Sequence, residues 1–567
     1  MIFRVVLALA LSAPPVTASP APQAHPCPVA VPARTSCGFL VVPERRDAPG
    51  RTIRVGYAVR HSTARERRPD PVVYMSGGPG SASLQLTGFL SQMFPDRDVV
   101  TLEQRGGRYS EPVLSCPETA QALLGRLRRP PADVGAAAAG CRDRLREQGV
   151  DLRGYTTREM AADVVALRRE LGYPSWNLFG VSYSTRVMLA AAAADPGGTR
   201  SVVLDSFLPE SVAWYDDAER NLADTVARLG VKDAFATMRA RLNASPARVP
   251  TTDPLLGRAF TALMSGDDVA AVLGEALHET DVAAVAGELV PALAEGHDEL
   301  LRPLADAVGE GLVSHEFGLY HAVQCQDELP FNAFAGGSRL FTLDADKAVC
   351  DAWGLPKSPP LNAAPRAPAL VLGGQYDPTT PVRTGRPAAE ALPRARFVEI
   401  PRASHAVFLS SACARAEIAA FLDDPAGGGA GPCPDDEHRP DDLRVTAAPY
   451  AISRAPWLAA PFAVFALAAL VQLVAAGLRG RALAAFGGLA GVAFAGLTAQ
   501  AVYGLAERNE TALAVGVPEV VGLYTWIAVA AVALTAAGAL ARRRRWQGWA
   551  ATAVGAGFLV WWFTWFL

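Results

Sequence analysis

The sequence predicts a mostly parallel α/β domain with a helical insertion, followed by a block of four membrane-spanning helices. First, short apolar strands alternate with helical stretches between Pro71 and Asp205, as expected for a parallel sheet whose strands are joined by helices. Second, this alternation stops between Asp205 and about Asn362, where amphipathic helices with Ala, Leu and Val faces take over. Third, residues 456–567 are apolar almost throughout.

The chain has 567 residues, too many for one ordinary domain, and its formal net charge of −3 gives no indication of a nucleic-acid partner. Arg4, the apolar run Val5–Ala13 and the small residues and prolines after it are typical of a signal peptide, which we place at residues 1–24. The apolar core is too short to span a bilayer stably, and an N-terminal anchor is the alternative interpretation.

Eight cysteines lie in the soluble part of the chain: Cys27, Cys37, Cys116, Cys141, Cys325, Cys350, Cys413 and Cys433. Their spacing matches no Cys/His metal motif, so no zinc site is expected, and the serine chemistry described below requires neither a metal nor an organic cofactor. An even number of cysteines in an exported chain favours disulfides, with buried free thiols as the alternative. Pairing between sequence neighbours would close short loops, but the sequence leaves the connectivity open.

Four C-terminal apolar stretches each approach the ~20 residues that a spanning helix needs: Pro456–Leu478, Ala482–Leu505, Val520–Leu540 and Trp546–Leu567. Arg479 and Arg481 lie between the first two stretches, and Arg542–Arg545 between the last two. Because positively charged loops stay in the cytoplasm, the chain should enter the membrane from outside and end outside. This orientation agrees with the signal peptide; a very apolar soluble helical domain is the alternative.

The expected domain order places the catalytic part outside the cell membrane. The α/β core occupies residues 25–206 and 362–424, the helical cap 207–361, a Gly/Pro/Asp-rich linker 425–455 and the transmembrane domain 456–567. A helical insertion at this point would form a lid over the active site and select substrates by access.

The segment Gly180-Val181-Ser182-Tyr183-Ser184 lies between the predicted strand Trp176–Gly180 and the predicted helix Thr185–Ala194. A serine flanked by small residues between a strand and a helix is the nucleophile-elbow pattern of the α/β-hydrolase fold. The tight turn presents the hydroxyl beyond the sheet. We therefore expect an α/β-hydrolase fold with a helical cap insertion, and Ser182 as the nucleophile.

A serine nucleophile needs a base and a carboxylate that orients the base, in the chain order Ser, acid, His for this fold. His405 follows the apolar strand Phe397–Ile400, and Asp377 lies just past the strand Ala369–Gly373. These two residues are the predicted partners of Ser182. Asp205 is the alternative acid, although a place at the hinge to the cap suits it better; His438 lies in the linker and is a poor candidate.

The oxyanion hole of such an enzyme uses two backbone N–H groups. One is expected from Tyr183, which follows the nucleophile. The other is expected from the loop Ser76–Gly80, with Gly78 preferred and Gly77 next, because glycines let the backbone approach the substrate closely. The alternative interpretation is a simple Gly-Pro turn, but the loop follows an early strand in the expected place.

The motifs Ser76-Gly77-Gly78-Pro79-Gly80 and Gly180-Val181-Ser182-Tyr183-Ser184, together with Glu103-Gln104-Arg105-Gly106 after a strand, resemble the proline iminopeptidase/tripeptidyl aminopeptidase family of α/β-hydrolases. The resemblance covers about residues 27–424, and Pro365–Pro434 resembles the C-terminal module of the tripeptidyl aminopeptidase branch. It implies an aminopeptidase acting on peptides with a free N-terminus. It also implies that the cap segment Gln324–Phe331 bears acidic ligands for the substrate ammonium, Glu328 and Asp327, although a solvated charge pair beside a disulfide is the other interpretation.

The chain departs from the pattern of that family at three positions. Many members have His, Asp and Gly where this sequence has Ser76, Glu103 and Ser184. None of these changes removes a predicted triad member, but they leave the peptide specificity open. The remaining alternatives are an esterase or lactonase with the same triad, and a catalytically silent receptor with a hydrolase-like ectodomain.

Overall fold

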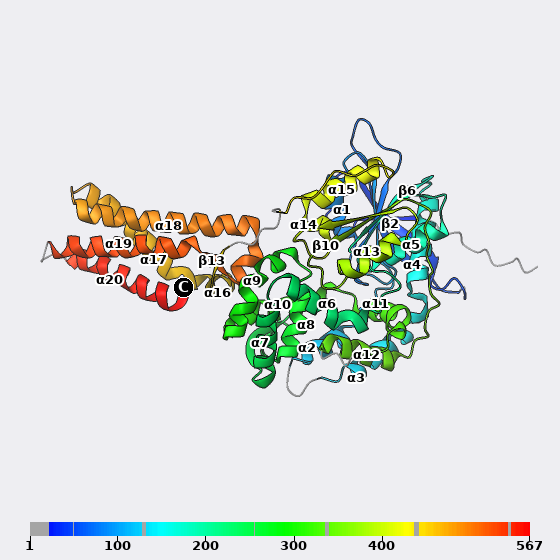
Figure 1. The fold of residues 1–567 in the computed structure, drawn as a ribbon, viewed down its shortest axis with the longest axis horizontal. Coiled ribbons are helices and arrows are strands. Elements are labelled where there is room, and N and C mark those ends of the chain that lie inside the picture. Colours follow the sequence, from blue (N-terminus) through cyan, green and yellow to red (C-terminus); the bar gives the residue numbers. More distant parts are fainter. Residues whose placement is uncertain are drawn as a thin grey trace, which may run out of the picture.

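The structure is a computed structural model that describes residues 22–48, 50–127, 132–254, 256–334, 340–435, 442–541 and 546–567. It consists of a sheet domain, a helical cap and an elongated four-helix block that projects from the cap side of the molecule (Figure 1). Most of the predicted signal peptide, together with Arg542–Arg545, lies outside the described residues. The described part begins with residues 22–25, which form the edge strand of the sheet.

Nine strands form the central sheet in the order β1-β2-β3-β5-β4-β6-β7-β10-β11. The strands are β1 (Pro22–His25), β2 (Thr35–Pro43), β3 (Thr52–Arg60), β4 (Val72–Met75), β5 (Val99–Leu102), β6 (Trp176–Val181), β7 (Thr199–Asp205), β10 (Ala369–Gly374) and β11 (Ala395–Ile400). The first three strands are antiparallel, and the sheet is parallel from β5 to β11. The carboxyl ends of the parallel strands therefore meet at one edge, where the fold presents its functional side chains.

Each face of the sheet is covered by its own hydrophobic core. On β4, Val73 and Met75 pack in one core and Val72 and Tyr74 in the other, as the two-residue period of a strand requires. Helices α4 (Thr157–Glu170), α5 (Ser184–Ala194) and α13 (Val382–Glu390) cover the first face, and α3 (Val134–Glu147) extends the same core farther from the sheet, where it packs on α12. Those on the second face are α1 (Thr87–Met93), α14 (Val407–Ser410) and α15 (Ala412–Asp423). The sheet is thus buried on both sides, which explains its continuous apolar strands.

The cap is mostly helical, as predicted, but it also contains a β-hairpin that the sequence did not reveal. Its helices are α6 (Trp214–Arg228), α7 (Lys232–Ala244), α8 (Gly266–Ala276), α9 (Thr280–Glu295), α10 (Leu301–Ser314), α11 (Phe317–Val323) and α12 (Phe341–Trp353). The hairpin pairs β8 (Ala247–Asp253) with β9 (Arg258–Met264). Helix α2 (Pro117–Gly125) lies beside the cap in Figure 1. Short turns complete the sheet domain, η1 (Leu84–Leu86) and η2 (Leu152–Gly154), and the cap, η3 (Asp298–Leu300), the π-helical η4 (Gln324–Glu328) and η5 (Leu329–Phe331).

Four C-terminal helices are long and apolar enough to cross a membrane. They are α17 (Ala460–Gly477) with the preceding turn η6 (Pro456–Ala459), α18 (Ala482–Arg508), α19 (Val520–Leu540) and α20 (Trp546–Trp561) with the following turn η8 (Trp562–Phe566). Small residues allow close packing: a Cβ on Gly488 would lie 2.5 Å from Leu473 N, and one on Gly491 would lie 2.6 Å from Ala469 Cβ. The C-terminus lies at the end of the block that faces the cap (Figure 1).

The second half of the predicted linker is ordered and joins the helical block to the cap. It contains β12 (Leu443–Val445), which pairs with β13 (Gly516–Pro518) from the loop between α18 and α19, and α16 (Ala448–Arg454). In the same loop, the turn η7 (Glu510–Ala514) follows Asn509, whose Nδ2 donates to the carbonyl of Asp281 on α9 at 3.0 Å. Leu505 and Val515 are buried in the hydrophobic core of the cap. The two domains therefore share a packed interface.

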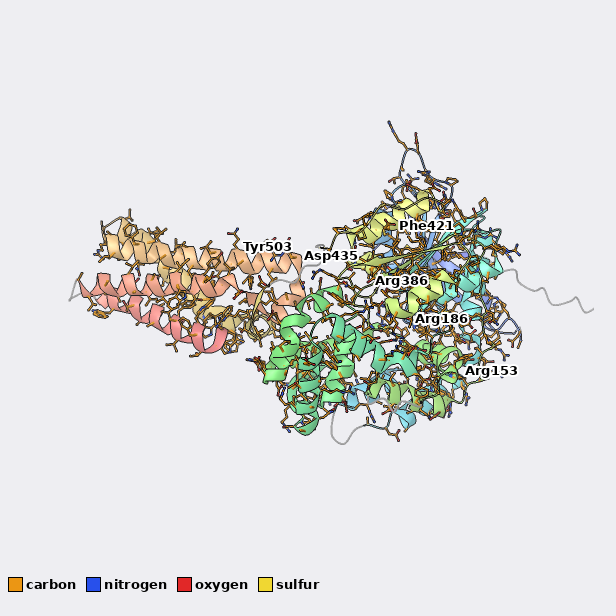
Figure 2. All side chains as sticks on the ribbon, viewed as in Figure 1. Arg153, Arg186, Arg386, Phe421, Asp435 and Tyr503 are labelled. Atoms are coloured by element: carbon orange, nitrogen blue, oxygen red, sulfur yellow. A yellow bond between two sulfur atoms is a disulfide. The ribbon has the colours of Figure 1, made fainter. Side chains whose placement is uncertain are left out.

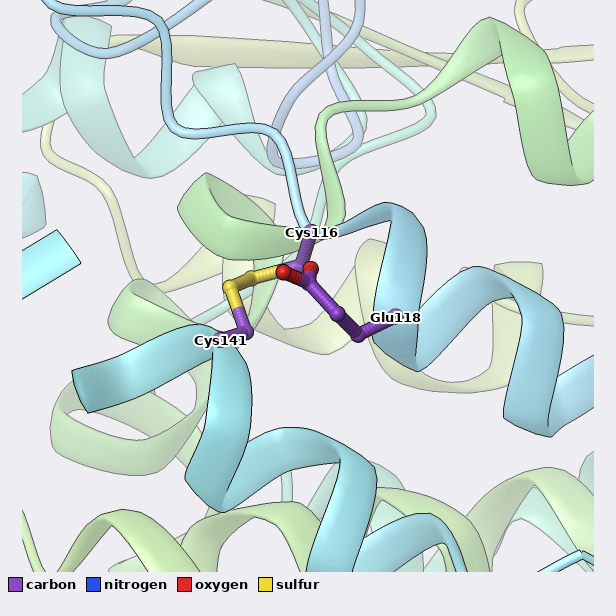
Figure 3. Close-up of side chains that lie close together, drawn as sticks. All are labelled: Cys116, Glu118 and Cys141. Carbon is purple, nitrogen blue, oxygen red and sulfur yellow. A yellow bond between two sulfur atoms is a disulfide. The ribbon is translucent and has the colours of Figure 1, made fainter. Parts of the chain in front are cut away.

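All eight cysteines form disulfides between sequence neighbours: Cys27–Cys37, Cys116–Cys141, Cys325–Cys350 and Cys413–Cys433. Figure 3 shows Glu118 beside the second of these bridges, a cluster that resembles a metal site in composition. Both sulfurs are already bonded to each other, and Arg144 donates to the two Glu118 carboxylate oxygens at 2.7 and 3.0 Å. This cluster is therefore a cross-link between α2 and α3 with an ion pair at its side.

Candidate active site

Ser182 occupies a sharp turn between β6 and α5. Its φ of 55° lies in the left-handed region, which non-glycine residues rarely adopt outside such special turns. The turn also requires a residue without a side chain two positions earlier, because a Cβ on Gly180 would lie 2.7 Å from the carbonyl oxygen of Ser184. The backbone N–H of Ser182 donates to the carbonyl of Asp205 on β7 at 2.9 Å. These features match a nucleophile elbow.

Ser184, where glycine is usual, has a specific place in this elbow. The side chain is fully buried, and its Oγ accepts a hydrogen bond from Val181 N at 2.8 Å. It donates to the carbonyl of Met75 at 2.7 Å. The hydroxyl thus links β4 to the end of β6, and the substitution is compatible with the turn.

Asp377 and His405 meet at the carboxyl edge of the sheet, as the sequence predicts. The Nδ1 atom of His405 lies 2.7 Å from Oδ2 of Asp377. The other oxygen of Asp377 accepts hydrogen bonds from the backbone N–H groups of Thr379 and Thr380, each at 2.8 Å. The Thr380 hydroxyl donates to Oδ2 at 2.6 Å. Because an ionised carboxylate only accepts, Nδ1 of His405 carries the proton in this pair and Nε2 is the free position.

The charges of this pair stabilise each other. Burial alone would raise the pKa of Asp377, but the charge and hydrogen bond of His405 and the hydrogen bonds of Thr380 hold that pKa well below its usual range. Burial lowers the pKa of His405, yet the charge and hydrogen bond of Asp377 outweigh it and the net shift is upward. Asp377 thus remains a carboxylate at every physiological pH.

Asp205, the alternative acid, holds the backbone of the histidine loop. Its carboxylate accepts from Val407 N at 3.0 Å, from Phe408 N at 2.8 Å and from the hydroxyl of Ser206 at 3.1 Å. Burial raises the pKa of Asp205 to about 6, against the lowering effect of these hydrogen bonds and of His405. Its hydrogen bonds serve the chain just after the histidine, while Asp377 binds the ring. His438 lies outside the described residues.

The glycine loop Ser76–Gly80 lies against Ser182. A Cβ on Gly77 would be 2.8 Å from Cβ of Ser182 and 3.4 Å from its Oγ, and Gly78 has a φ of 102°. Gln104 holds the loop from behind: its Nε2 donates to the carbonyls of Ser76 and Gly77 at 2.8 and 2.7 Å, and its Oε1 accepts from Gly80 N at 3.0 Å. The loop is therefore fixed beside the serine. Gly77 is needed there because a side chain would not fit, and Gly78 because its φ is positive.

Glu103, the residue before Gln104, also supports the segment that follows β4. Its Oε1 accepts hydrogen bonds from Ser83 N at 2.8 Å and Leu84 N at 2.9 Å. The side chain is fully buried, and burial raises its pKa to about 7 despite these hydrogen bonds. Glu103 and Gln104 thus brace the two ends of the segment that follows β4, a role that the sequence motif alone did not disclose.

Asp327 is linked to the residue after the nucleophile. Its Oδ2 accepts from both the backbone N–H and the hydroxyl of Thr157 at 2.6 Å. The same hydroxyl lies 2.9 Å from the Tyr183 hydroxyl, whose side chain is buried. Burial raises the pKa of Asp327, partly offset by these hydrogen bonds. In the structure, Asp327 thus fixes the start of α4 and, through it, Tyr183.

Glu328 forms a buried ion pair with Arg186, one helical turn beyond Ser182 on α5. Its other oxygen accepts from Trp214 N at 3.2 Å, at the start of the cap. The guanidinium of Arg186 also donates to the carbonyls of Leu208 and Pro209. Figure 2 shows Arg186 where the sheet domain meets the cap. Both predicted acidic residues therefore lie at the junction between α4, α5 and the cap.

The structure also brings to this site a residue that the sequence analysis did not single out. The ring of His278, between α8 and α9 of the cap, contacts the ring of His405 in a tilted arrangement with centroids 4.9 Å apart. Its sequence surroundings, Ala276-Leu277-His278-Glu279-Thr280, contain no motif that signals this contact. The contact depends on how the cap docks on the sheet, which a single sequence does not show.

Comparison with known families agrees with this geometry. The sequence model of the alpha/beta hydrolase fold matches residues 70–412, which is more than half of the chain. The chain belongs to this family. In this α/β-hydrolase, the match includes the elbow, the cap and both Asp377 and His405.

Two curated relatives are similar over most of the chain. The α/β-hydrolase is 25% identical over 477 residues to the serine protease Hip1 of Mycobacterium tuberculosis, covering 72% of this chain and 88% of that one. It is also 25% identical over 411 residues to the tripeptidyl aminopeptidase of Streptomyces lividans, covering 62% and 74%.

Solved structures of similar fold include the proline iminopeptidase of Mycobacterium smegmatis, at 16% identity and a TM-score of 0.34, covering 68% of this chain and 97% of that one. Another is a thermophilic esterase from Thermogutta terrifontis, at 16% identity and a TM-score of 0.30, covering 65% and 91%.

Proposed function

We propose that this α/β-hydrolase is a membrane-anchored serine aminopeptidase that acts outside the cytoplasm on peptides with a free N-terminus. The observation that carries the proposal is the hydrogen bond between His405 Nδ1 and Asp377, together with the elbow at Ser182. This pairing leaves His405 Nε2 unprotonated, and only such a nitrogen can accept the proton of a serine hydroxyl.

The reaction would proceed through an acyl-enzyme. Ser182 Oγ bonds to the scissile carbonyl carbon while its proton moves to His405 Nε2. The C–N bond then breaks, and the same proton passes to the leaving amine. Water next adds to the acyl carbon, giving its proton to His405, and the ester bond to Ser182 breaks as Oγ is reprotonated.

Negative charge develops on the carbonyl oxygen in both steps. Tyr183 N–H, and an N–H from Gly78 or Gly77, are the proposed donors to it. The contact between Gly77 and Ser182 supports this assignment, since it places the glycine loop beside the nucleophile. Gln104 supports it as well, because its three hydrogen bonds prevent the loop from rotating away.

Peptide substrates are supported by the two curated relatives, a serine protease and a tripeptidyl aminopeptidase. Glu328 is the proposed partner for the substrate ammonium, with Asp327 beside it. The Glu328 carboxylate is buried next to Arg186 on the helix that begins at the elbow. An ammonium that binds there would form a charge-assisted hydrogen bond to this carboxylate, which would also keep its ion pair with Arg186.

The extracytoplasmic location rests on three features of the chain. These are the predicted signal peptide, the four disulfides, which persist in oxidising compartments, and the four apolar helices with arginines in alternate loops. An epitope inserted after Asp435 tests this location directly. Protease added to intact cells should cleave it.

A paired-substrate assay tests the reaction. Purified full-length protein would be assayed with a peptide amide that has a free N-terminus and with the same peptide acetylated at its N-terminus. The variant Ser182→Ala is the inactive control. The proposal expects rapid cleavage of the first peptide alone. Equal cleavage of the two peptides would overturn the aminopeptidase assignment. If the protein hydrolysed simple esters but cleaved neither peptide, an esterase would be favoured.

A second assay tests Glu328. The variant Glu328→Gln should raise KM for the free peptide at least about tenfold, because a neutral amide loses the charge-assisted contact. The matched control Glu299→Gln changes an exposed acidic residue of the cap. If Glu328→Gln instead lowered kcat and Tm and left KM for the free peptide unchanged, Glu328 would hold the cap in place rather than bind the amine.

A further inference from the structure

His278 contacts His405 in two ways. The backbone N–H of His405 donates to the carbonyl of His278 at 3.0 Å. The two imidazole rings are tilted against each other, with an angle of 33° between their planes and 4.9 Å between their centroids. Ring and backbone of the candidate base are thus both held by one residue of the cap.

The same side chain reaches the turn that carries Asp377. The Nε2 atom of His278 hydrogen-bonds the Oγ1 atom of Thr379, and the backbone N–H of Thr379 donates to Asp377. One imidazole therefore bridges the two loops whose relative position sets the Asp377–His405 hydrogen bond. Neither residue of the proposed pair could shift without disturbing this bridge.

The residues beside His278 reinforce the contact. The hydroxyl of Ser404 donates to the carbonyl of Leu277, and the backbone N–H of Ser404 donates to the Thr280 hydroxyl at 3.0 Å. Thr280 in turn donates to Ser410 at 3.0 Å. The cap turn 277–280 is thus hydrogen-bonded to the histidine loop on both sides of His405.

His278 has no part in the proton transfers described above, and its surroundings favour the neutral ring. Burial lowers its pKa, and the charge of His405 lowers it further, against the opposing effects of Glu275, Asp377 and Glu279. The nearest carboxylate is Glu275, with Oε2 at 3.6 Å from Nδ1. A neutral ring can cover one face of His405 without repelling the imidazolium that forms during catalysis.

We propose that His278 is a positioning residue of the cap, which fixes the catalytic imidazole of His405 and the Asp377 turn in register for attack by Ser182. The inference rests on the proposed function. It gives the cap a second task besides substrate selection, because the site would be incomplete without the turn 277–280. Substrate would then enter past another part of the cap, with α8 and α9 staying docked.

Three variants separate the contributions of His278. His278→Ala removes ring and hydrogen bond, His278→Phe keeps a flat ring but loses the bond to Thr379, and Thr379→Val removes the bond from the other side. His297→Ala is the matched control, since His297 is a cap histidine that is exposed and lies beside Glu299. All variants retain the backbone carbonyl of His278.

The expected result is a fall in kcat of about 10- to 100-fold for His278→Ala, with KM changed less than about twofold, because misplacement of a catalytic group affects the chemical step. The fall in kcat should be smaller for His278→Phe and for Thr379→Val. Loss of the covering ring should also hydrate His405, and since burial lowers the pKa of His405, the acidic limb of kcat/KM should move to higher pH in His278→Ala.

A folded His278→Ala variant with wild-type kcat and an unchanged pH profile would overturn the inference. If that variant does not fold, Thr379→Val and His278→Phe provide the test. Wild-type kcat in both variants would overturn the inference as well. A variant with a lower Tm but normal kcat would assign His278 a purely structural role. Failure of the proposed function is distinguishable, because the wild-type protein itself would then not cleave the peptide with a free N-terminus.

Discussion

Asp205 and Asp377, at the ends of the adjacent strands β7 and β10, both bind the loop that carries His405, but at different points. Asp377 accepts from the imidazole at 2.7 Å, whereas Asp205 accepts from the backbone N–H groups of Val407 and Phe408. One carboxylate orients the ring and the other anchors the chain behind it. The two roles have different consequences for mutagenesis.

Replacement of the two aspartates should separate these roles. Asp377→Asn should lower kcat by about 10³- to 10⁴-fold, because an amide favours the wrong tautomer of the histidine. Asp205→Asn keeps an acceptor for the loop N–H groups and should cost about tenfold or less. Steady-state kinetics of the two variants provides the comparison. A greater loss for Asp205→Asn would reverse the assignment of the acid.

The pH dependence should follow the raised pKa of His405. Burial lowers this pKa, but the charge and hydrogen bond of Asp377 raise it more. Since only unprotonated His405 can act as a base, kcat/KM should fall as the pH drops through a value above the ~6.5 of an ordinary histidine. Measurement of kcat/KM from acidic to alkaline pH tests this expectation, and a midpoint below 6 would contradict it.

Gln104→Ala should release the glycine loop from its support. The variant loses hydrogen bonds to the carbonyls of Ser76 and Gly77 and to Gly80 N, so the proposed oxyanion donors are no longer held in place. We expect a loss in kcat of about 10²-fold, comparable to removal of one oxyanion donor, with a smaller effect on KM. Gln148→Ala, which changes an exposed glutamine, is the control. Unaltered kcat in Gln104→Ala would show that the loop holds its shape unaided.

Glu103→Gln should change how stability depends on pH. Burial raises the pKa of Glu103 to about 7 in the folded protein, above its unfolded value of ~4.3. A carboxyl group with a raised pKa destabilises the fold progressively as the pH rises between those two values, by up to about 4 kcal/mol here. The glutamine variant should therefore gain Tm relative to wild type at pH 8 but not at pH 4.5. A difference in Tm that is the same at both pH values would contradict this reasoning.

Local patterns were sufficient to identify the candidate triad. Ser182, Asp377 and His405 each follow a strand, and the chain order of the fold relates them, so the contact between Asp377 and His405 could be expected from sequence. The four apolar helices were equally accessible, because their length and composition are continuous along the chain. Both predictions depend on features that lie within short segments.

Contacts between distant segments could not be predicted in this way. His278 reaches His405 only because the turn 277–280 of the cap docks on the sheet edge, and no local pattern encodes that approach. The hairpin β8–β9 lies between the stretches of helical periodicity in the cap and was not predicted. The predicted linker 425–455 reads as irregular from its glycines and prolines, whereas β12 is ordered by pairing with a strand more than 70 residues further on.

The pairing of β12 with β13, together with the hydrogen bond from Asn509 to Asp281, bears on how the enzyme meets its substrates. A hydrolase on a loose tether would tumble above the lipid surface and present its entrance in every direction. In the proposed membrane-anchored enzyme, the cap would sit on the extramembrane end of the helices, and one side of it would always face the bilayer. Peptides would then have to approach along a restricted set of directions, and the distance of Ser182 from the lipid headgroups would be a fixed property of the molecule.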